Sequence, residues 1–151
     1  MLKGIDPLLS PEALLALRAM GHGDDLIIAD SNFPADSVAR STVFGRPIRM
    51  DCGIVRAVQA VLSVMPIDTY VTDAVARMEV VGAPDETVPV QAEVMQLLEG
   101  TEFRMIGIER YAFYERAKQA YAVIWTQERR PYADFAIRKG VLGPDEVLPN
   151  S

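Results

Sequence analysis

The chain has 151 residues and a formal net charge of −6, from 21 acidic and 15 basic side chains. Half of its residues are hydrophobic and 24% are charged, which is typical of a folded globular protein and not of a disordered chain. The basic residues are scattered along the chain, so a nucleic acid is not an expected partner. This length predicts a single domain over residues 1–151.

The N-terminal region and the cysteine content indicate a cytoplasmic protein. Asp6, Pro7 and Pro11 interrupt the apolar run of a secretory signal, and no stretch approaches the roughly 18 apolar residues of a membrane-spanning helix. Cys52 is the only cysteine and His22 the only histidine, so we expect no disulfide and no ordinary zinc or iron–sulfur site. An all-oxygen metal site stays open, but the spacing of an EF-hand is absent. We therefore predict no membrane partner, no metal and no cofactor.

Helix and strand patterns alternate along the whole chain. Ser10, Pro11 and Glu12 mark the start of a helix, which Gly21 ends. The short, β-branched run at 26–29 predicts a strand that is buried on both faces. After a loop at 31–37 the pattern gives a strand at 47–50, a helix at 54–65, a strand at 74–81, a helix at 90–99, a strand at 104–108, a helix at 110–120, and strands at 121–127 and 135–139.

This alternation predicts an α/β fold, a three-layer domain in which helices flank a largely parallel sheet. Sheets of this kind bind ligands beyond the carboxyl ends of their strands. The glycines at 21–23 match neither a Walker loop nor a dinucleotide fingerprint, which disfavours a nucleotide-binding domain. The carboxyl ends of the strands are therefore where we expect the site.

Seven polar side chains are candidates for chemistry, and each also has an ordinary structural explanation. The glycines around His22 allow turns that hold its ring over a neighbouring cleft, and they suit a solvated loop histidine equally well. Asp30 follows the strand at 26–29, where a carboxylate either caps the next turn or faces the ligand edge. The remaining candidates, which packing or turn formation would explain by default, are Asp68, Arg110, Tyr114, Tyr132 and Asp134.

Four stretches of the chain together resemble the RbsD/FucU family of L-fucose mutarotases and D-ribose pyranases. They read SPEALLALRAMGHGDDLIIADSNFP, RMDCGIVRAVQAVL, PIDTY and IERYAFYERAKQAYAVIWTQERRPYADFAIRKGVL. The MGHGD and FYERA blocks are specific, and the IERYAFYERA stretch is more similar to the fucose branch than to the ribose branch. The resemblance runs from Met1 to about Leu142.

The resemblance implies an isomerase that interconverts the α and β anomers of L-fucose or a related monosaccharide. Some members also exchange pyranose and furanose rings, and the family uses neither metal nor nucleotide. It further implies a ring-shaped homo-oligomer, a decamer, with active sites near the subunit contacts. The sugar that this chain uses and the ring forms that it exchanges are left open.

The family's site residues map onto the seven candidates. The resemblance implies that His22 donates a proton and that Asp68 supports catalysis. It implies sugar binding by Asp30, Arg110, Tyr114, Tyr132 and Asp134. One position departs from the family pattern, because Asp134 stands where the family has asparagine. An amide both donates and accepts hydrogen bonds, whereas an ionised carboxylate only accepts.

These residue types suit the implied reaction. Opening a hemiacetal requires one acid and one base, and an imidazole with an ordinary pKa of about 6.5 serves in either role at neutral pH. We expect His22 to lie over the carboxyl ends of the strands and to protonate the ring oxygen, while Asp68 or a water takes the anomeric proton. The alternative is a non-catalytic monosaccharide-binding or transport-accessory protein that has lost turnover through the change at Asp134.

Overall fold

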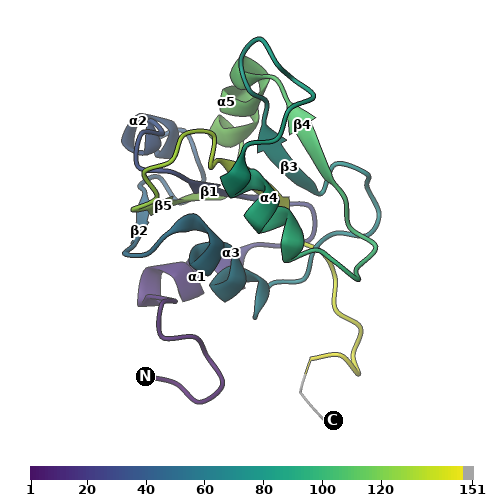
Figure 1. The fold of residues 1–151 in the computed structure, drawn as a ribbon. Coiled ribbons are helices and arrows are strands. Elements are labelled where there is room, and N and C mark those ends of the chain that lie inside the picture. Colours follow the sequence, from purple (N-terminus) through teal and green to yellow (C-terminus); the bar gives the residue numbers. More distant parts are fainter. Residues whose placement is uncertain (148–151) are drawn as a thin grey trace.

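Six strands form one central sheet in a computed structural model that describes residues 1–147 (Figure 1). They are β1 (Asp25–Ala29), β2 (Ile48–Met50), β3 (Val75–Met78), β4 (Met105–Ile108), β5 (Ala122–Thr126) and β6 (Phe135–Arg138). Their order in the sheet is β2-β5-β1-β6-β3-β4. Strand β6 is antiparallel to β1 and β3, and the other pairings are parallel. The last residue of the predicted domain, 151, lies outside the described residues.

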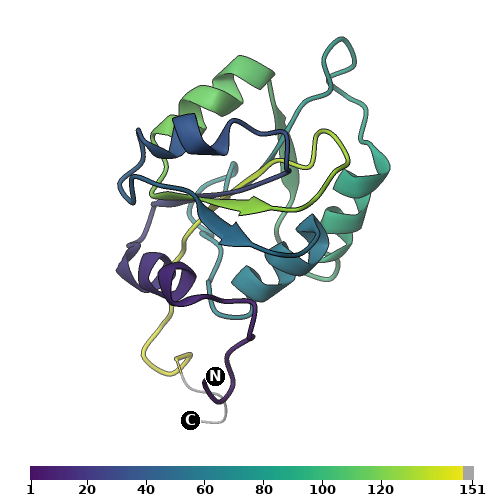
Figure 2. The same cartoon turned by 90° about the vertical axis from the view of Figure 1, so that its left-hand side faces the viewer.

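Helices cover both faces of this sheet. One apolar cluster joins the sheet to α1 (Pro11–Ala19), α3 (Ile54–Leu62) and α4 (Pro89–Gln96). A second cluster joins the opposite face to α2 (Ala35–Ala39) and α5 (Arg110–Lys118). Figure 2 shows α2 and α5 on one side of the sheet and α1 and α3 on the other. The predicted three-layer α/β fold is confirmed.

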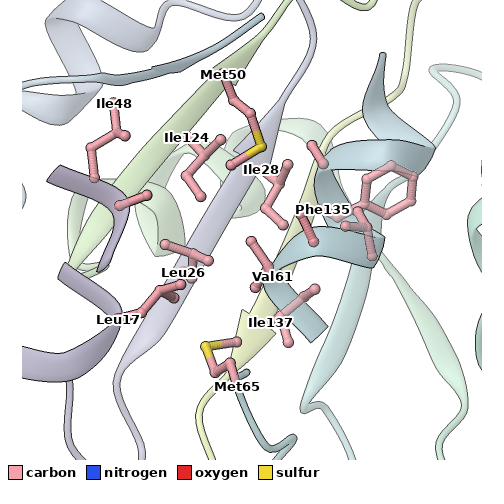
Figure 3. Close-up of a cluster of buried hydrophobic side chains, with 14 of the residues drawn as sticks. Leu17, Leu26, Ile28, Ile48, Met50, Val61, Met65, Ile124, Phe135 and Ile137 are labelled. Carbon is pink, nitrogen blue, oxygen red and sulfur yellow. The ribbon is translucent and has the colours of Figure 1, made fainter. Parts of the chain in front are cut away.

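The central strand β1 supplies both clusters, because successive side chains of a strand point to opposite faces. Leu26 and Ile28 belong to the cluster with α1 and α3, and Ile27 lies in the cluster with α5. All three side chains are fully buried. Figure 3 shows Leu26 and Ile28 beside Val61 of α3. Burial of each such side chain contributes about 1.5–3 kcal/mol, which fixes the register of β1 in the sheet.

Apart from shifts of one to three residues at the ends of other helices and strands, three details differ from the sequence prediction. The predicted loop at 31–37 contains the start of α2, whose five residues are too few to show an apolar repeat. The strand predicted at 74–81 ends at Met78, because the chain turns there and Val80 bridges to Ala83. The direction of β6 was not predicted, since periodicity does not reveal which strands become neighbours.

The antiparallel β6 decides which loops meet at each end of the sheet. The segment before β6 lies with the segments that follow β1, β3 and β4, and we call this end the carboxyl edge. The segment after β6 lies with those that precede β1 and β3, and we call this end the amino edge. The backbone confirms the second grouping, since the N–H of Gly23 donates to the carbonyl of Lys139 and that of Asp68 to the carbonyl of Arg138.

Candidate active site

A pocket of about 260 Å³ opens at the carboxyl edge. The five side chains predicted to bind sugar all line it, although they come from the end of β1, the start of α5 and the loop before β6. The complete lining is Asp30, Asn32, Phe33, Met78, Val81, Arg110, Tyr114, Pro131, Tyr132 and Asp134. Sequence reasoning missed Asn32 and Phe33, which follow Asp30 directly in the chain.

Asp30 is held by the turn that follows β1. Its Oδ1 accepts hydrogen bonds from the backbone N–H groups of Asn32 and Phe33, both at 2.9 Å. This pattern is the turn that an aspartate forms with the residues after it. Asp30 therefore caps the turn and lines the pocket at once, so its two alternative roles coexist.

Asp134 lies directly against Asp30 at the start of β6. Its Oδ1 accepts a hydrogen bond from the backbone N–H of Asp30 at 3.0 Å, and both side chains line the pocket. Asp30 is 3% exposed and Asp134 is 4% exposed. Burial raises the pKa of Asp30, and burial together with the neighbouring Asp30 charge raises the pKa of Asp134 well above its ordinary value.

The first turn of α5 forms the cationic and aromatic wall of the pocket. Arg110 Nε donates to Tyr114 Oη at 3.4 Å, and its guanidinium group lies 5.6 Å from the centre of the Tyr114 ring. Tyr114 also packs against Phe33, with ring centres 5.6 Å apart. Glu109 caps the helix by accepting from the N–H groups of Tyr111 and Ala112. This wall presents a cation, a hydroxyl group and aromatic faces.

Tyr132 adopts a left-handed backbone conformation, with φ of 62°. For a residue other than glycine, such a conformation costs about 1–3 kcal/mol and persists only where the surroundings enforce it. Gln91 of α4, which is fully buried, donates from Nε2 to the carbonyl of Tyr132 at 3.0 Å and to that of Met78 at 2.8 Å. The Tyr132 hydroxyl group accepts from the N–H of Val81 at 3.3 Å. Gln91 therefore connects the loop that contains Tyr132 to the end of β3.

The sequence carries no signal for the role of Gln91. Gln91 and Gln96 are both polar residues of the same short helix, but Gln96 is exposed at its end. Only the packing of α4 against the loop before β6 distinguishes the two. Sequence reasoning therefore missed Gln91.

His22 and Asp68 form a pair at the amino edge. His22 Nε2 lies 3.0 Å from Asp68 Oδ1, which also accepts from the N–H of Tyr70 at 2.9 Å. The Tyr70 hydrogen bond and then the His22 contact lower the pKa of Asp68. The Asp68 side chain is 3% exposed, whereas the His22 side chain is 46% exposed. Asp68 therefore holds one ring nitrogen, the Tyr70 ring lies 5.3 Å from the imidazole between ring centres, and about half of the His22 side chain stays open to solvent.

The geometry corrects one expectation about His22. His22 precedes β1 and the pocket follows it, and a strand of five residues spans roughly 16 Å at its usual rise. The prediction that His22 lies over the carboxyl edge of its own chain is wrong. The structure brings together Asp30, Arg110, Tyr114, Tyr132 and Asp134, and separately His22 and Asp68.

Gly23 sets the turn that presents His22. Its φ of +90° is readily available only to glycine, and its N–H donates to the Lys139 carbonyl after β6. Gly21 donates its N–H to Asp24 Oδ2 at 2.8 Å. The two glycines thus anchor the histidine turn to the amino edge.

An ion-pair network lies beside this turn. Asp25 accepts two hydrogen bonds from Arg116 of α5 and two from Arg138 of β6, at 2.9–3.1 Å. Arg138 also donates to Asp73 at 3.0 Å. Burial opposes the charge on Asp25, but the bonds from both arginines outweigh it and lower the pKa of this carboxyl group. The network fixes α5 and the amino edge relative to each other.

Within residues 1–147, no group of three or more His, Cys, Asp or Glu side chains is arranged to hold a metal ion. Over the same range, no helix is long and apolar enough to cross a membrane.

The fold and the pocket define an α/β domain that presents carboxyl, amide, guanidinium and phenol groups to a small polar ligand at the carboxyl edge of its sheet. The chain belongs to the RbsD / FucU transport protein family, which matches residues 3–142. The resemblance predicted from the sequence is confirmed.

Known relatives cover nearly the whole chain. Fucose mutarotase from Homo sapiens is 44% identical over 153 residues, which cover 97% of this chain and 98% of that protein. The crystal structure of the fucose mutarotase from Streptococcus pneumoniae in complex with L-fucose is 34% identical and aligns with a TM-score of 0.82, covering 94% of this chain and 100% of that chain. The crystal structure of protein Atu2016 is 55% identical with a TM-score of 0.91, over 95% of this chain and 97% of that chain.

Proposed function

We propose that this protein is an L-fucose mutarotase, an isomerase that interconverts the α and β anomers by opening and closing the sugar ring. The observation that carries the proposal is the convergence of three distant segments on one pocket of carboxyl, guanidinium and phenol groups. Full-length similarity to fucose mutarotases supports the choice of L-fucose. We place this enzyme in the cytoplasm.

The pocket binds the sugar through its hydroxyl groups. Asp30 accepts hydrogen bonds, Arg110 donates them, and Tyr114 and Tyr132 do both. The aromatic faces of Phe33 and Tyr114 pack against the apolar C–H face of the ring. This arrangement holds a neutral polyol without a metal ion or a nucleotide.

Ring opening needs a proton at the ring oxygen and the removal of the proton from the anomeric hydroxyl group. His22 protonates the ring oxygen, and a water molecule or Asp68 accepts the anomeric proton. The aldehyde then rotates about its bond to C2, and the same transfers in reverse close the other anomer. The 3.0 Å contact supports a further role for Asp68, which orients the imidazole and stabilises its protonated form.

A complete site requires two subunits in this proposal. His22 and the pocket lie at opposite edges of one chain, so the pocket of one subunit receives His22 of the partner subunit. The half-exposed imidazole supports this arrangement, because its open side is free to face a neighbour. A closed ring of ten copies repeats the same contact around the assembly. A monomeric mass in solution at working concentration contradicts this assembly.

Exchange NMR on anomer-equilibrated L-fucose tests the function. We expect the wild-type protein to accelerate exchange between the two anomeric signals, and His22→Asn to lower the rate by about 10²–10⁴-fold while L-fucose still binds. D-ribose and D-galactose, measured in parallel, rank the sugars. Wild-type rates in the His22→Asn variant refute the assigned role of His22. Binding without exchange by the wild-type protein indicates the non-catalytic sugar-binding alternative instead.

A further inference from the structure

Asp30 and Asp134 make an unusual contact at the carboxyl edge. Asp30 and Asp134 are 3% and 4% exposed, both line the pocket, and Asp134 Oδ1 accepts the backbone N–H of Asp30 at 3.0 Å. Within the described part of the chain, neither forms an ion pair with a lysine, an arginine or the histidine. Two neighbouring negative charges without a counter-ion are strongly unfavourable in a buried site.

The backbone around the pair determines which carboxyl group keeps the charge. Asp30 accepts N–H groups from Asn32 and Phe33, which stabilise its ionised form. Asp134 accepts one N–H, that of Asp30, and is as deeply buried. A proton shared by the two groups therefore belongs mainly to Asp134, whose O–H can then donate to the Asp30 carboxylate.

We propose that Asp134 acts as a neutral carboxylic acid and that the pair, sharing one proton, forms a specificity element with one charged acceptor and one O–H donor for neighbouring hydroxyl groups of a sugar. This inference rests on the proposed function and adds the protonation state in which the pocket binds its substrate. A carboxylic acid donates and accepts hydrogen bonds, as an amide does, and an ionised carboxylate only accepts. Asp134 thereby performs the hydrogen bonding of an amide while it stays able to titrate.

The other charged groups near the pair do not neutralise its charge in place of this proton. Arg110 is engaged with the Tyr114 hydroxyl group and ring. On the adjacent β3, Arg77 donates to the Pro84 carbonyl. Beyond the end of β5, Glu128 is paired with Arg130. The groups that face the pair from the surrounding segments are Arg110, Tyr114 and Tyr132, with Arg77, Glu79 and Glu128 on the flanking elements.

The shared proton gives sugar binding a defined dependence on pH. Burial raises the pKa of Asp134 well above its ordinary value, so the neutral acid is present below the raised pKa and is lost above it. Loss of the proton removes the O–H donor and leaves two adjacent charges in the pocket. We therefore expect L-fucose to bind more weakly on the alkaline side.

The decisive experiment compares the L-fucose dissociation constant of the wild type with that of Asp134→Asn from pH 5 to pH 9.5, by calorimetry. The asparagine keeps the shape and the donor but cannot titrate. We expect the wild-type dissociation constant to rise by about tenfold or more across the alkaline limb, and that of the variant to stay flat there. Parallel pH profiles for the two proteins overturn the proposal.

A second measurement reads the proton directly and requires neither turnover nor a folded variant. In wild-type protein labelled with ¹³C at the aspartate carboxyl carbons, we expect one buried carboxyl signal to keep the chemical shift of a protonated acid at pH 7. Full ionisation of all aspartates by pH 6 overturns the inference even if the enzyme is active. If the aspartate is protonated but the protein does not accelerate anomer exchange, the inference about Asp134 holds and the mutarotase function is wrong.

Discussion

The two edges of the sheet hold their carboxyl groups in opposite electrostatic states. At the amino edge, the arginine pair lowers the pKa of Asp25 against the effect of burial, and hydrogen bonds from Tyr70 and His22 lower that of Asp68. At the carboxyl edge, burial raises the pKa of Asp30 and of Asp134. Within the described residues, the Asp25 and Asp68 carboxylates of the amino edge have cationic or imidazole partners, whereas Asp30 and Asp134 at the carboxyl edge form no ion pair and keep capacity for a ligand.

This difference separates two tasks of the proposed enzyme. The amino edge builds a rigid support for one exposed imidazole, through Gly23, Asp68 and the network around Asp25. The carboxyl edge builds a pocket that recognises hydroxyl groups. Changes at the amino edge should therefore alter the rate of proton transfer, and changes at the carboxyl edge should alter binding.

Among the changes that keep His22, Asp68→Asn should have the largest effect. The amide still accepts the Tyr70 N–H, but it no longer stabilises a protonated His22. We expect the anomer exchange rate to fall by about 100-fold, with an unchanged dissociation constant for L-fucose. The pH–rate profile should shift as well, which a purely structural role of Asp68 does not produce. An equal loss of binding and rate contradicts this assignment.

Arg110→Ala should have the complementary effect. It removes the cation from the pocket wall and the hydrogen bond to Tyr114, while the Glu109 cap of α5 stays in place. We expect the dissociation constant for L-fucose to rise by about tenfold, as measured by calorimetry, with little change in melting temperature. The matched control is Arg40→Ala, since Arg40 is exposed and its one ion pair within residues 1–147 is with the exposed Asp36. A similar loss of affinity in Arg40→Ala contradicts the assignment of Arg110 to L-fucose binding.

The fold and the pocket differ in how far the sequence predicts them. The apolar run at 26–29 is a strand because its side chains must be buried on both faces, and this reasoning is local. The position of His22 at the amino end also follows from chain order, since it precedes β1, and the prediction that placed it over the carboxyl ends did not use this fact. The insertion of β6 between β1 and β3 is not local, and it alone brings Tyr132 and Asp134 to Asp30.

Gln91→Leu tests a positioning role that the sequence did not reveal. The leucine fills the buried space but leaves the carbonyls of Met78 and Tyr132 without their donor. We expect a loss of about 1–3 kcal/mol in the free energy of unfolding, measured in urea, and several-fold weaker L-fucose binding. Gln96→Leu, on the exposed end of the same helix, should change neither quantity. If Gln91→Leu loses stability but binds L-fucose normally, Gln91 has no positioning role.

The smallest expected effect is a pair of opposite stability changes with pH. Because the folded-state pKa of Asp134 is raised, wild-type stability falls as the pH rises above about 3.8, and Asp134→Asn should melt higher than wild type at neutral pH. The folded-state pKa of Asp25 is lowered, so the ionised Asp25 stabilises the fold at pH values above about 3.8. Asp25→Asn should therefore melt at a lower temperature than wild type at neutral pH. Both differences should shrink in acid, as calorimetric melting from pH 3 to pH 8 will show. The same sign for both variants contradicts the comparison of the two edges.

The proposal that the two edges meet across a subunit contact is tested most directly by co-expressing His22→Asn and Arg110→Ala subunits. Each variant alone is impaired in one half of every site, and random mixing of equal amounts restores both halves in about a quarter of the sites. The assay uses L-fucose well below its dissociation constant, where tenfold weaker binding lowers the rate of the Arg110→Ala parent to about a tenth of wild type. We predict that the mixed oligomer regains about a quarter of the wild-type rate under these conditions, which exceeds the average of its two parents. A mixed oligomer with no more activity than the average of its parents contradicts a site shared between subunits.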